Sequence, residues 1–417
     1  MKERLLPGFK HLRGVFNQWG GSTAIFFAYT HLAHDLCNGL HMALLPVIRA
    51  GLGLNYMQSG LLLSAHHITS GISQIPGGWL SDRFNRYVAI AIGVGGVGLA
   101  ALAVGLSSAY YPLLIILVIM GILSGLYQPS AVSLLSSSFE RARRGKVIGL
   151  HLVGGSIGFA IGPVLGGLIA AMLGWHSAFI ILCIPALVAV TLVLWKFRQQ
   201  KRAAGGELLN HTYTGDGALA EPTTGRVGLV QVLRSVAAIT ALVVSTQLIA
   251  GSAMAFVPLY LVDKHGVAPA YATMLLGIIR GGGVVGSMLG GWLSDKWDRK
   301  NAIFLTLVAT GPMVYLITIM PLNLSLVAVF ILVGIVMQMK QSTTQPFLMD
   351  STPQQLRGII FGIYFGLSME GASILQPVVG HFMDTFGIVE VFHIIALISV
   401  ALSLLALLIL IKSKLSR

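Results

Sequence analysis

The sequence predicts an all-α membrane protein, with twelve transmembrane helices arranged as two parallel-repeat six-helix halves. Three observations predict this fold. The 417-residue chain is 55% hydrophobic with a mean hydropathy of +0.83, whereas less than about half of a soluble protein is apolar. Apolar runs close to the roughly 20 residues that cross a bilayer recur along the chain. A short charged phrase also occurs twice, 213 residues apart.

The apolar runs give the predicted helices in order. Many of them contain Gly, Ser or Pro, which neighbouring helices accommodate within a membrane. We predict spans at residues 22–48, 56–80, 87–107, 110–138, 147–173, 175–195, 236–262, 268–293, 301–320, 322–349, 358–383 and 388–411.

The distribution of basic residues predicts the orientation. If both termini are cytoplasmic, 23 of the 27 Lys and Arg residues fall in inside segments, which is the bias found in membrane proteins. The net charge of +13 is therefore a topology signal, and we expect no nucleic-acid partner. No cleavable signal peptide is evident, and the two cysteines fall inside spans, so we expect free thiols. We expect a multi-pass protein of a cell membrane, a bacterial inner membrane in particular.

The repeat divides the chain into two halves. The stretch "GGWLSDRFNR" (77–86) is matched by "GGWLSDKWDR" (290–299), and an offset of 213 also links Arg144 to Arg357 and Gly149 to Gly362. An offset of 214 pairs Pro163 with Pro377. We predict an N-terminal half at 22–197 and a C-terminal half at 236–411, joined by a polar cytoplasmic linker at 198–235. The tails at 1–21 and 412–417 are expected to be cytoplasmic.

These residues carry a family resemblance. The repeated phrase resembles the signature Gly-x-Leu-x-Asp-Arg-x-Gly-Arg between helices 2 and 3 of the major facilitator superfamily. The predicted fifth helix resembles the G-x8-G-x3-GP-x2-GG pattern of its proton-coupled antiporter branch, through Gly149, Gly158, Gly162, Pro163, Gly166 and Gly167. The first helix, "THLAHDLCNGLHMALLP", resembles the fosmidomycin-resistance-like group. The resemblance implies the major facilitator fold and a secondary transporter, not an enzyme.

The resemblance also implies a cytoplasmic gate in which Asp82 meets Arg86 and the start of helix 11 near Gly358. The expected gate residues are Gly78, Asp82, Arg83, Arg86, Gly291, Asp295, Arg299, Arg144 and Arg357. The alternative is that they are solvated loop charges. The family's second glycine is replaced by Asn85 and Asp298, which we expect to tolerate the left-handed backbone of the turn.

Polar residues inside spans indicate a functional site, because burying a charge in a bilayer is costly. Three readings compete: a substrate and proton site, structural hydrogen bonds, or a metal site, for which the "HLAHD" segment lacks the H-E-x-x-H pattern. We assign proton coupling to Asp35, His31 and Glu370, and a substrate cavity to His34, His66, Gln74, Arg280 and Lys340. We prefer Asp35 to Glu370 as the residue that carries the proton. Glu370 is expected to pair with Arg280, whereas Asp35 has only His31 one turn earlier. No metal is expected.

The function predicted from the sequence is proton-driven efflux of a small organic, drug-like or anionic compound by alternating access. One alternative is proton-coupled uptake of an organic anion by a symporter. A second alternative is a membrane-embedded metalloenzyme. No phosphate-binding loop occurs, so no nucleotide or other cofactor is expected. The expected partners are a small-molecule substrate, protons and the lipid bilayer, and we expect a monomer.

Overall fold

The fold is built of helices throughout the part of the chain that the computed structural model describes, which is residues 21–83, 85–203, 229–352, 364 and 366–415. Within these ranges eight helices are long and apolar enough to cross a membrane, or nine if one bent pair forms a single span. The predicted all-helical membrane fold is confirmed.

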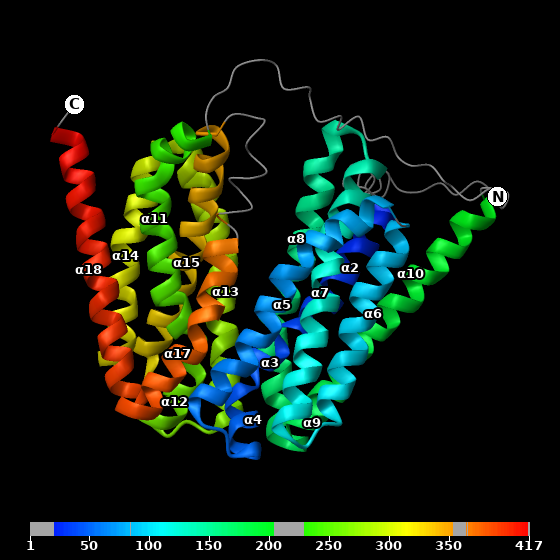
Figure 1. The fold of residues 1–417 in the computed structure, drawn as a ribbon, viewed down its shortest axis with the longest axis horizontal. Helices are drawn as coiled ribbons and strands as arrows, with labels where there is room; N and C mark the ends of the chain where they lie inside the picture. Colours follow the sequence, from blue (N-terminus) through cyan, green and yellow to red (C-terminus); the bar gives the residue numbers. More distant parts are fainter. Residues whose placement is uncertain (1–20, 84, 204–228, 353–363, 365, 416–417) are drawn as a thin grey trace, which may run out of the picture. The chain divides into compact units, whose positions relative to one another are not determined.

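The described residues from 21 to 203 form nine helices, and Figure 1 shows how most of them are arranged. They are α2 (Gly21–Asn38), α3 (Leu40–Ala43), α4 (Leu45–Leu52), α5 (Tyr56–Arg83), α6 (Arg86–Gly105), α7 (Tyr110–Ser138), α8 (Arg141–Leu173), α9 (Trp175–Leu182) and α10 (Ile184–Ala203). Helix α10 thus continues past residue 195, where the sequence predicts its end. Of the predicted linker, residues 204–228 lie outside the described part of the chain.

The second half begins with α11, which starts at residue 229, before the predicted start at 236. Its elements are α11 (Leu229–Met254), α12 (Val257–His265), α13 (Pro269–Lys296), α14 (Arg299–Ile319), α15 (Leu324–Asp350), the π-helix η2 (Gly366–Glu370), α17 (Gly371–Phe386) and α18 (Ile388–Leu415). In Figure 1, α11, α14, α15 and α18 run alongside one another.

Three predicted spans are interrupted, and in each of them a break lies next to a proline. The first span is divided into α2, α3 and α4, and the sixth and seventh spans are divided into two helices each. Pro46 lies near the start of α4, Pro185 near the start of α10 and Pro258 near the start of α12. Proline lacks the N–H that would continue the preceding helix and its ring opposes the carbonyl one turn back, so the helix breaks before it. The break between α11 and α12 bends this span by 47°.

The chain forms two compact units. Unit 1 comprises residues 1–41, 69–169 and 173–213, and unit 2 comprises residues 42–68, 170–172 and 214–417. Residues 42–68, which are part of the first sequence repeat, thus belong to the same unit as the second repeat. The domain boundaries inferred from the repeat remain predictions.

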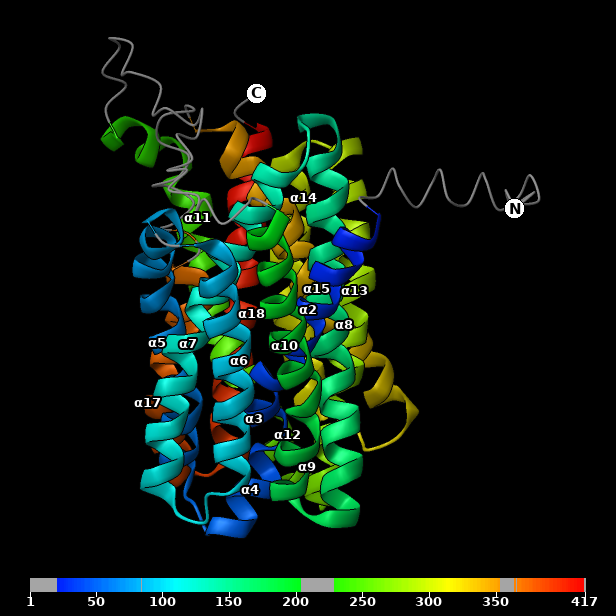
Figure 2. The ribbon, with the colours of Figure 1, turned by 90° about the vertical axis from the view of Figure 1, so that its right-hand side faces the viewer.

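Small residues bring the helices of each unit into close contact. In unit 1, α6 and α7 run side by side (Figure 2), and Gly93 of α6 faces the backbone of Tyr127 on α7. In unit 2, Gly282 of α13 faces the carbonyl of Ile331 on α15, and Ser403 of α18 accepts a 2.9 Å hydrogen bond from the amide of Gly311 on α14. Such contacts are typical of helix packing in lipid, where small side chains and interhelical hydrogen bonds replace hydrophobic burial.

Candidate functional site

The side chains of His31, His34 and Asp35 lie together on α2, in unit 1, and each is at most 7% exposed. His34 Nδ1 lies 2.7 Å from one carboxylate oxygen of Asp35, and His31 Nε2 lies 3.2 Å from the other. Asp35 therefore contacts an imidazole at each oxygen. The sequence prediction that Asp35 has only His31 as a neighbour is wrong, because the adjacent His34 folds back onto the same carboxylate.

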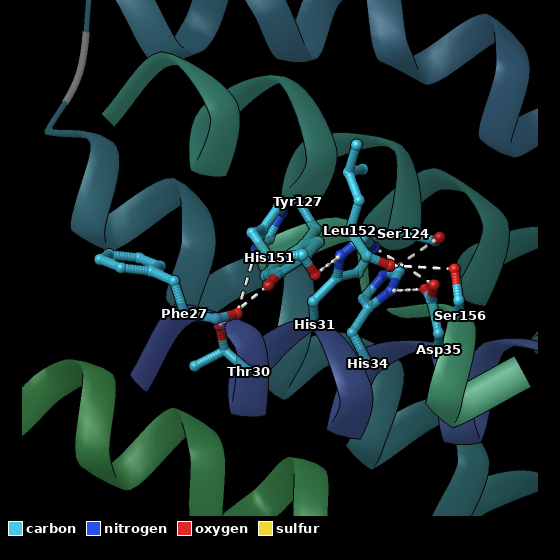
Figure 3. Close-up of polar contacts among 10 residues, drawn as sticks. All are labelled: Phe27, Thr30, His31, His34, Asp35, Ser124, Tyr127, His151, Leu152 and Ser156. Carbon is cyan, nitrogen blue, oxygen red and sulfur yellow. Dashed lines mark hydrogen bonds and ion pairs between the residues drawn. The ribbon is translucent and has the colours of Figure 1, made fainter. Parts of the chain in front are cut away.

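Helix α7 closes one side of this cluster. The ring of Tyr127 stacks on His34 with centroids 4.4 Å apart, and the Ser124 hydroxyl lies 3.3 Å from His34 Nε2. The Tyr127 hydroxyl lies 2.9 Å from Thr30 Oγ1 (Figure 3). These contacts orient the His34 ring so that its other nitrogen, Nδ1, points at Asp35.

Helix α8 contributes His151, which is fully buried. His31 Nδ1 donates to the His151 carbonyl at 2.8 Å, and His151 Nδ1 donates to the Phe27 carbonyl at 3.0 Å. The two imidazole rings stack with centroids 4.2 Å apart (Figure 3). Two histidines thus each bond the backbone of the other helix. We call His31, His34, Asp35, Tyr127 and His151 the histidine cluster.

The glycines of α8 allow α2 to approach this closely. A Cβ at Gly158 would lie 2.5 Å from the Leu32 carbonyl oxygen, and a Cβ at Gly154 would collide with the Ala28 carbonyl. Gly162 makes ordinary contact with α2, whereas Gly149 has open space around it. Gly154, Gly158 and Gly162 repeat every four residues and form a glycine stripe on α8, and the helix that packs against this stripe is α2. Pro163, Gly166 and Gly167 are buried within a continuous α8.

The other predicted cavity residues are divided between the two units. Gln74 is exposed in unit 1, while His66, Arg280 and Lys340 belong to unit 2. His66 and Lys340 are buried, and Arg280 is exposed and interacts electrostatically with His67. A shared substrate cavity remains a prediction. The side chain of Glu370 and its expected pairing with Arg280 lie outside what the structure describes.

Two arginines of the repeated phrase make equivalent contacts. Arg86 donates to the Ser137 hydroxyl at 2.9 Å, and Arg299 pairs with the Asp350 carboxylate. Ser137 and Asp350 are themselves 213 positions apart. Arg86 therefore binds near the C-terminal end of α7, and Arg299 binds the equivalent end of α15.

The remaining gate residues are only partly described. Arg144 donates to the Phe139 carbonyl at 2.9 Å, and Asp295 is exposed. Arg357 and the side chains of Asp82 and Arg83 lie outside the described part of the structure. The role of Asp82 in a gate therefore remains a prediction.

Asn85 and Asp298 do not have the left-handed backbone that the sequence suggested. Their φ angles are −64° and −58°, and their side chains accept the amide N–H of Tyr87 and Lys300. Each is an N-cap, a position where Asn and Asp are favoured over most residues. The glycine of the family pattern is thus replaced by a residue that begins the next helix.

The close helix contact in each phrase comes from its first glycine. A Cβ at Gly77 would lie 2.9 Å from the Gly125 carbonyl oxygen, and a Cβ at Gly290 would lie 2.9 Å from the Met339 backbone. The second glycines, Gly78 and Gly291, have no atom within 4 Å of that position. The close packing therefore involves Gly77 and Gly290, while a gate role of Gly78 and Gly291 remains a prediction.

A second charged cluster lies within unit 2, where α4 and α5 meet α12 and α17. Arg49 Nη1 lies 2.8 Å from Asp263 Oδ2, and the same carboxylate accepts the Tyr56 hydroxyl. The Arg49 guanidinium stands 4.1 Å over the Tyr56 ring. The Asp384 carboxylate accepts the amides of Tyr56 and Met57 at 2.8 and 2.9 Å, which caps the N-terminus of α5. We call Arg49, Tyr56, Asp263 and Asp384 the Asp263 cluster.

Sequence reasoning missed several of these residues. His151 lies four residues before Gly155 on the glycine-rich helix α8. A histidine inside an apolar span was the sequence signal that could have identified it as a site residue. Tyr127 resembles an ordinary core aromatic, and Asp263 and Asp384 resemble loop charges at helix ends. Their partners come from distant parts of the chain, so no local pattern reveals them.

The profile of the Major Facilitator Superfamily matches residues 27–375. The chain belongs to this superfamily. It is therefore a multi-pass membrane protein and a secondary transporter of small molecules, not an enzyme, and the metalloenzyme alternative is wrong.

Individual superfamily members show distant similarity to this chain. The fosmidomycin resistance protein of Escherichia coli is 21% identical over 357 residues, covering 84% of this chain and 85% of that protein. The tetracenomycin C resistance and export protein of Streptomyces glaucescens is 23% identical, covering 81% and 71%. A probable hexose phosphate transport protein of Chlamydia trachomatis is 26% identical, covering 67% and 65%.

Solved structures share the superfamily fold. A bacterial homolog of the human lysosomal transporter Spinster superposes with a TM-score of 0.74 at 15% identity, covering 92% of this chain and 96% of that chain. The peptide transporter POT in complex with sulfate gives a TM-score of 0.72 at 14% identity, covering 93% and 94%. At these identities the likeness extends to the fold alone.

Proposed function

We propose that this transporter is a proton-driven exporter of a small organic compound and that the histidine cluster carries the coupling proton. The observation that supports this most strongly is the contact of Asp35 with two imidazoles inside a membrane helix. Histidine changes charge near neutral pH, and a buried carboxylate alternates between partners as its neighbours gain or lose protons. Two of the relatives are named for resistance or export, and the glycine stripe resembles that of antiporters.

Uptake of an organic anion is the second candidate, and one observation favours an anionic substrate. Lys340 is 3% exposed, and its ammonium has no hydrogen-bond partner within the described part of the structure. A buried ammonium without a partner is unfavourable by several kcal/mol. A carboxylate or phosphate group of a substrate would supply the missing partner. This observation fits both export and uptake of an anion.

We propose that the Asp263 cluster holds the outer side closed in one state of the transport cycle. It lies at the end of α4 and at the start of α5, which the basic-residue bias places outside the cell. Its contacts join residues of the first repeat to residues of the second. Arg49 and Asp263, for example, are 214 positions apart in the sequence. Opening the outer side requires these contacts to break. The cytoplasmic gate at Asp82 and Asp295 is proposed to act at the opposite side.

The experiment is a transport assay with the purified protein in liposomes, loaded with a panel of drug-like cations, neutral compounds, carboxylates and phosphonates. An exporter oriented with its cytoplasmic side outward accumulates its substrate inside the liposome when the lumen is acidic, and collapse of the gradient abolishes accumulation. A symporter accumulates substrate only when protons and substrate enter together. Transport that ignores the proton gradient would contradict both proposals.

A further inference from the structure

The ring of His31 is bonded at both nitrogens, which fixes where its protons lie. Its Nδ1 is 2.8 Å from the carbonyl oxygen of His151, and a carbonyl only accepts, so Nδ1 carries a proton. Its Nε2 is 3.2 Å from Oδ2 of Asp35. A ring lone pair and a carboxylate oxygen at this distance would repel each other, so a second proton lies on this contact.

The neighbouring histidines do not supply that second proton. His34 donates from Nδ1 to the other oxygen of Asp35 and can accept the Ser124 hydroxyl at Nε2, so one proton satisfies its ring. His151 donates from Nδ1 to Phe27, and its Nε2 has no hydrogen-bond partner among the described residues, so it is also satisfied by one proton. The cluster therefore holds one proton more than three neutral imidazoles beside an ionised carboxylate.

We propose that this extra proton, shared between His31 Nε2 and Asp35 Oδ2, fastens α2 to α8, and that its departure releases the two helices. This inference rests on the proposed proton coupling, and it identifies the contact between His31 and Asp35 as the one that depends on the proton. Without the proton, His31 keeps one N–H and can bond either Asp35 or the His151 carbonyl. The contact with Asp35 lies within one turn of α2, whereas the bond to His151 crosses between two helices.

The surroundings keep the charge on His31. The stacked ring of His151 lies 4.2 Å away on α8, and two cationic rings at this distance would repel. The titratable groups that contact the pair from other helices include His151 of α8 and Tyr127 of α7, while Tyr87 of α6 and Lys196 of α10 lie beside Phe27, one turn earlier on α2. Lys196 is bonded to Thr23, two turns of α2 away from His31. Asp35 is therefore the carboxylate that balances the proton.

Gly155 is a positioning residue for this proton. A Cβ at this position would lie 2.6 Å from His31 Nε2 and 2.6 Å from Asp35 Oδ2, the two atoms that share the proton. Real Cβ atoms do not approach other atoms so closely, so the pair must separate in Gly155→Ala. Gly149 lies on the same helix with no atom within 4 Å of its Cβ position, so Gly149→Ala is the matched control.

Nitrogen-15 NMR of histidine-labelled full-length protein in lipid nanodiscs tests the inference, with the proton as the probe. We expect one histidine with both ring nitrogens protonated at neutral pH, and the loss of this signal in His31→Gln. The signal should persist in Gly149→Ala and disappear in Gly155→Ala, while the signals of His176, which bonds the Ser107 carbonyl away from the cluster, stay unchanged and show that the fold is intact. A singly protonated His31 in the wild type, or an unchanged signal in Gly155→Ala, would overturn the inference.

A fourth variant, Asp35→Asn, tests the position of the proton without adding a side chain to the helix contact. In Asp35→Asn the amide donates to His31 Nε2, so His31 needs only its Nδ1 proton and keeps its bond to His151. We expect a signal with Nδ1 alone protonated, and a doubly protonated ring in this variant would contradict the assignment. The liposome assay, read together with the NMR signal, distinguishes failure of the proposed function from failure of this inference. Gradient-independent transport with a doubly protonated His31 defeats the proposed function only, whereas gradient-driven transport with a singly protonated His31 defeats this inference only.

Discussion

Replacing Asp384 by asparagine should open the Asp263 cluster in a measurable fraction of molecules. Asp384 lies on the neighbouring helix α17, and its carboxylate accepts hydrogen bonds from the first two backbone amides of α5. Asparagine keeps one accepting oxygen, so the variant loses one hydrogen bond and the charge at the helix N-terminus. A net hydrogen bond contributes about 1 kcal/mol and a charge at an exposed helix N-terminus about 0.3–1 kcal/mol.

Asp384 is exposed, so the lower part of this range applies. A loss of about 1 kcal/mol shifts an equilibrium between closed and open states by about fivefold. The ratio of open to closed molecules rises by that factor, because the contact exists only when α5 and α17 meet. The helices themselves keep their other bonds, including the amide of Gln58, which Asn55 accepts at 2.7 Å.

Thiol labelling in intact cells measures this shift. A cysteine replaces the fully buried Ser59 of α5, in a chain whose Cys37 and Cys183 are changed to alanine. A membrane-impermeant maleimide should label this cysteine about fivefold faster in Asp384→Asn. Asp350→Asn is the control, because Asp350 makes its contact with Arg299 at the other end of its helix bundle. Equal labelling rates in wild type and Asp384→Asn would refute the reasoning.

Four further predictions concern other parts of the molecule. Asp82→Asn should lower turnover at least tenfold with substrate binding retained, and Asp295→Asn should have a milder effect, as measured by initial transport rates in liposomes; wild-type turnover in Asp82→Asn would remove Asp82 from the gate. Asp35→Asn should abolish gradient-driven accumulation while substrate exchange continues, and accumulation at the wild-type rate would make Asp35 structural. Lys340→Met should raise the melting temperature, because it removes a buried charge without a hydrogen-bond partner among the described residues, and should weaken binding of anionic substrates alone. A reporter that works only outside the cytoplasm should be inactive when fused to the C-terminus, since the basic-residue bias predicts a cytoplasmic end.

The sequence predicts the fold well because membrane spans and duplicated motifs leave strong local signals. Long apolar runs located the helices, and the repeated phrase located the equivalent loops. Proline chemistry explains the breaks at Pro46, Pro185 and Pro258, but Pro163 lies inside a continuous α8, so a proline in the sequence does not by itself predict a break. The end of α10 was placed too early and the start of α11 too late, because polar residues continue a helix beyond the apolar run.

The candidate site was predicted in part. Histidine and aspartate in a span are conspicuous, and the spacing of His31 and Asp35 placed them on one face of α2. His151 and Tyr127 reach the cluster through packing between helices, which depends on the glycines of α8. The sequence showed that this stripe would accept a close neighbour, but it did not show which helix that would be. For the Asp263 cluster, the carboxylates and their partners are more than two hundred residues apart.

The helices α4 and α12 share a construction that has a consequence for how the repeat evolved. Each begins at a proline and ends at a left-handed glycine, Gly53 with φ of 62° and Gly266 with φ of 66°. Two identical copies of such a helix would present the same charge to each other and repel. Arg49 and Asp263 instead carry opposite charges at positions 214 apart. For a duplicated helix with either charge at this position, a single change of charge in one copy turns a repelling pair into an ion pair without any change to the glycine turn of the backbone.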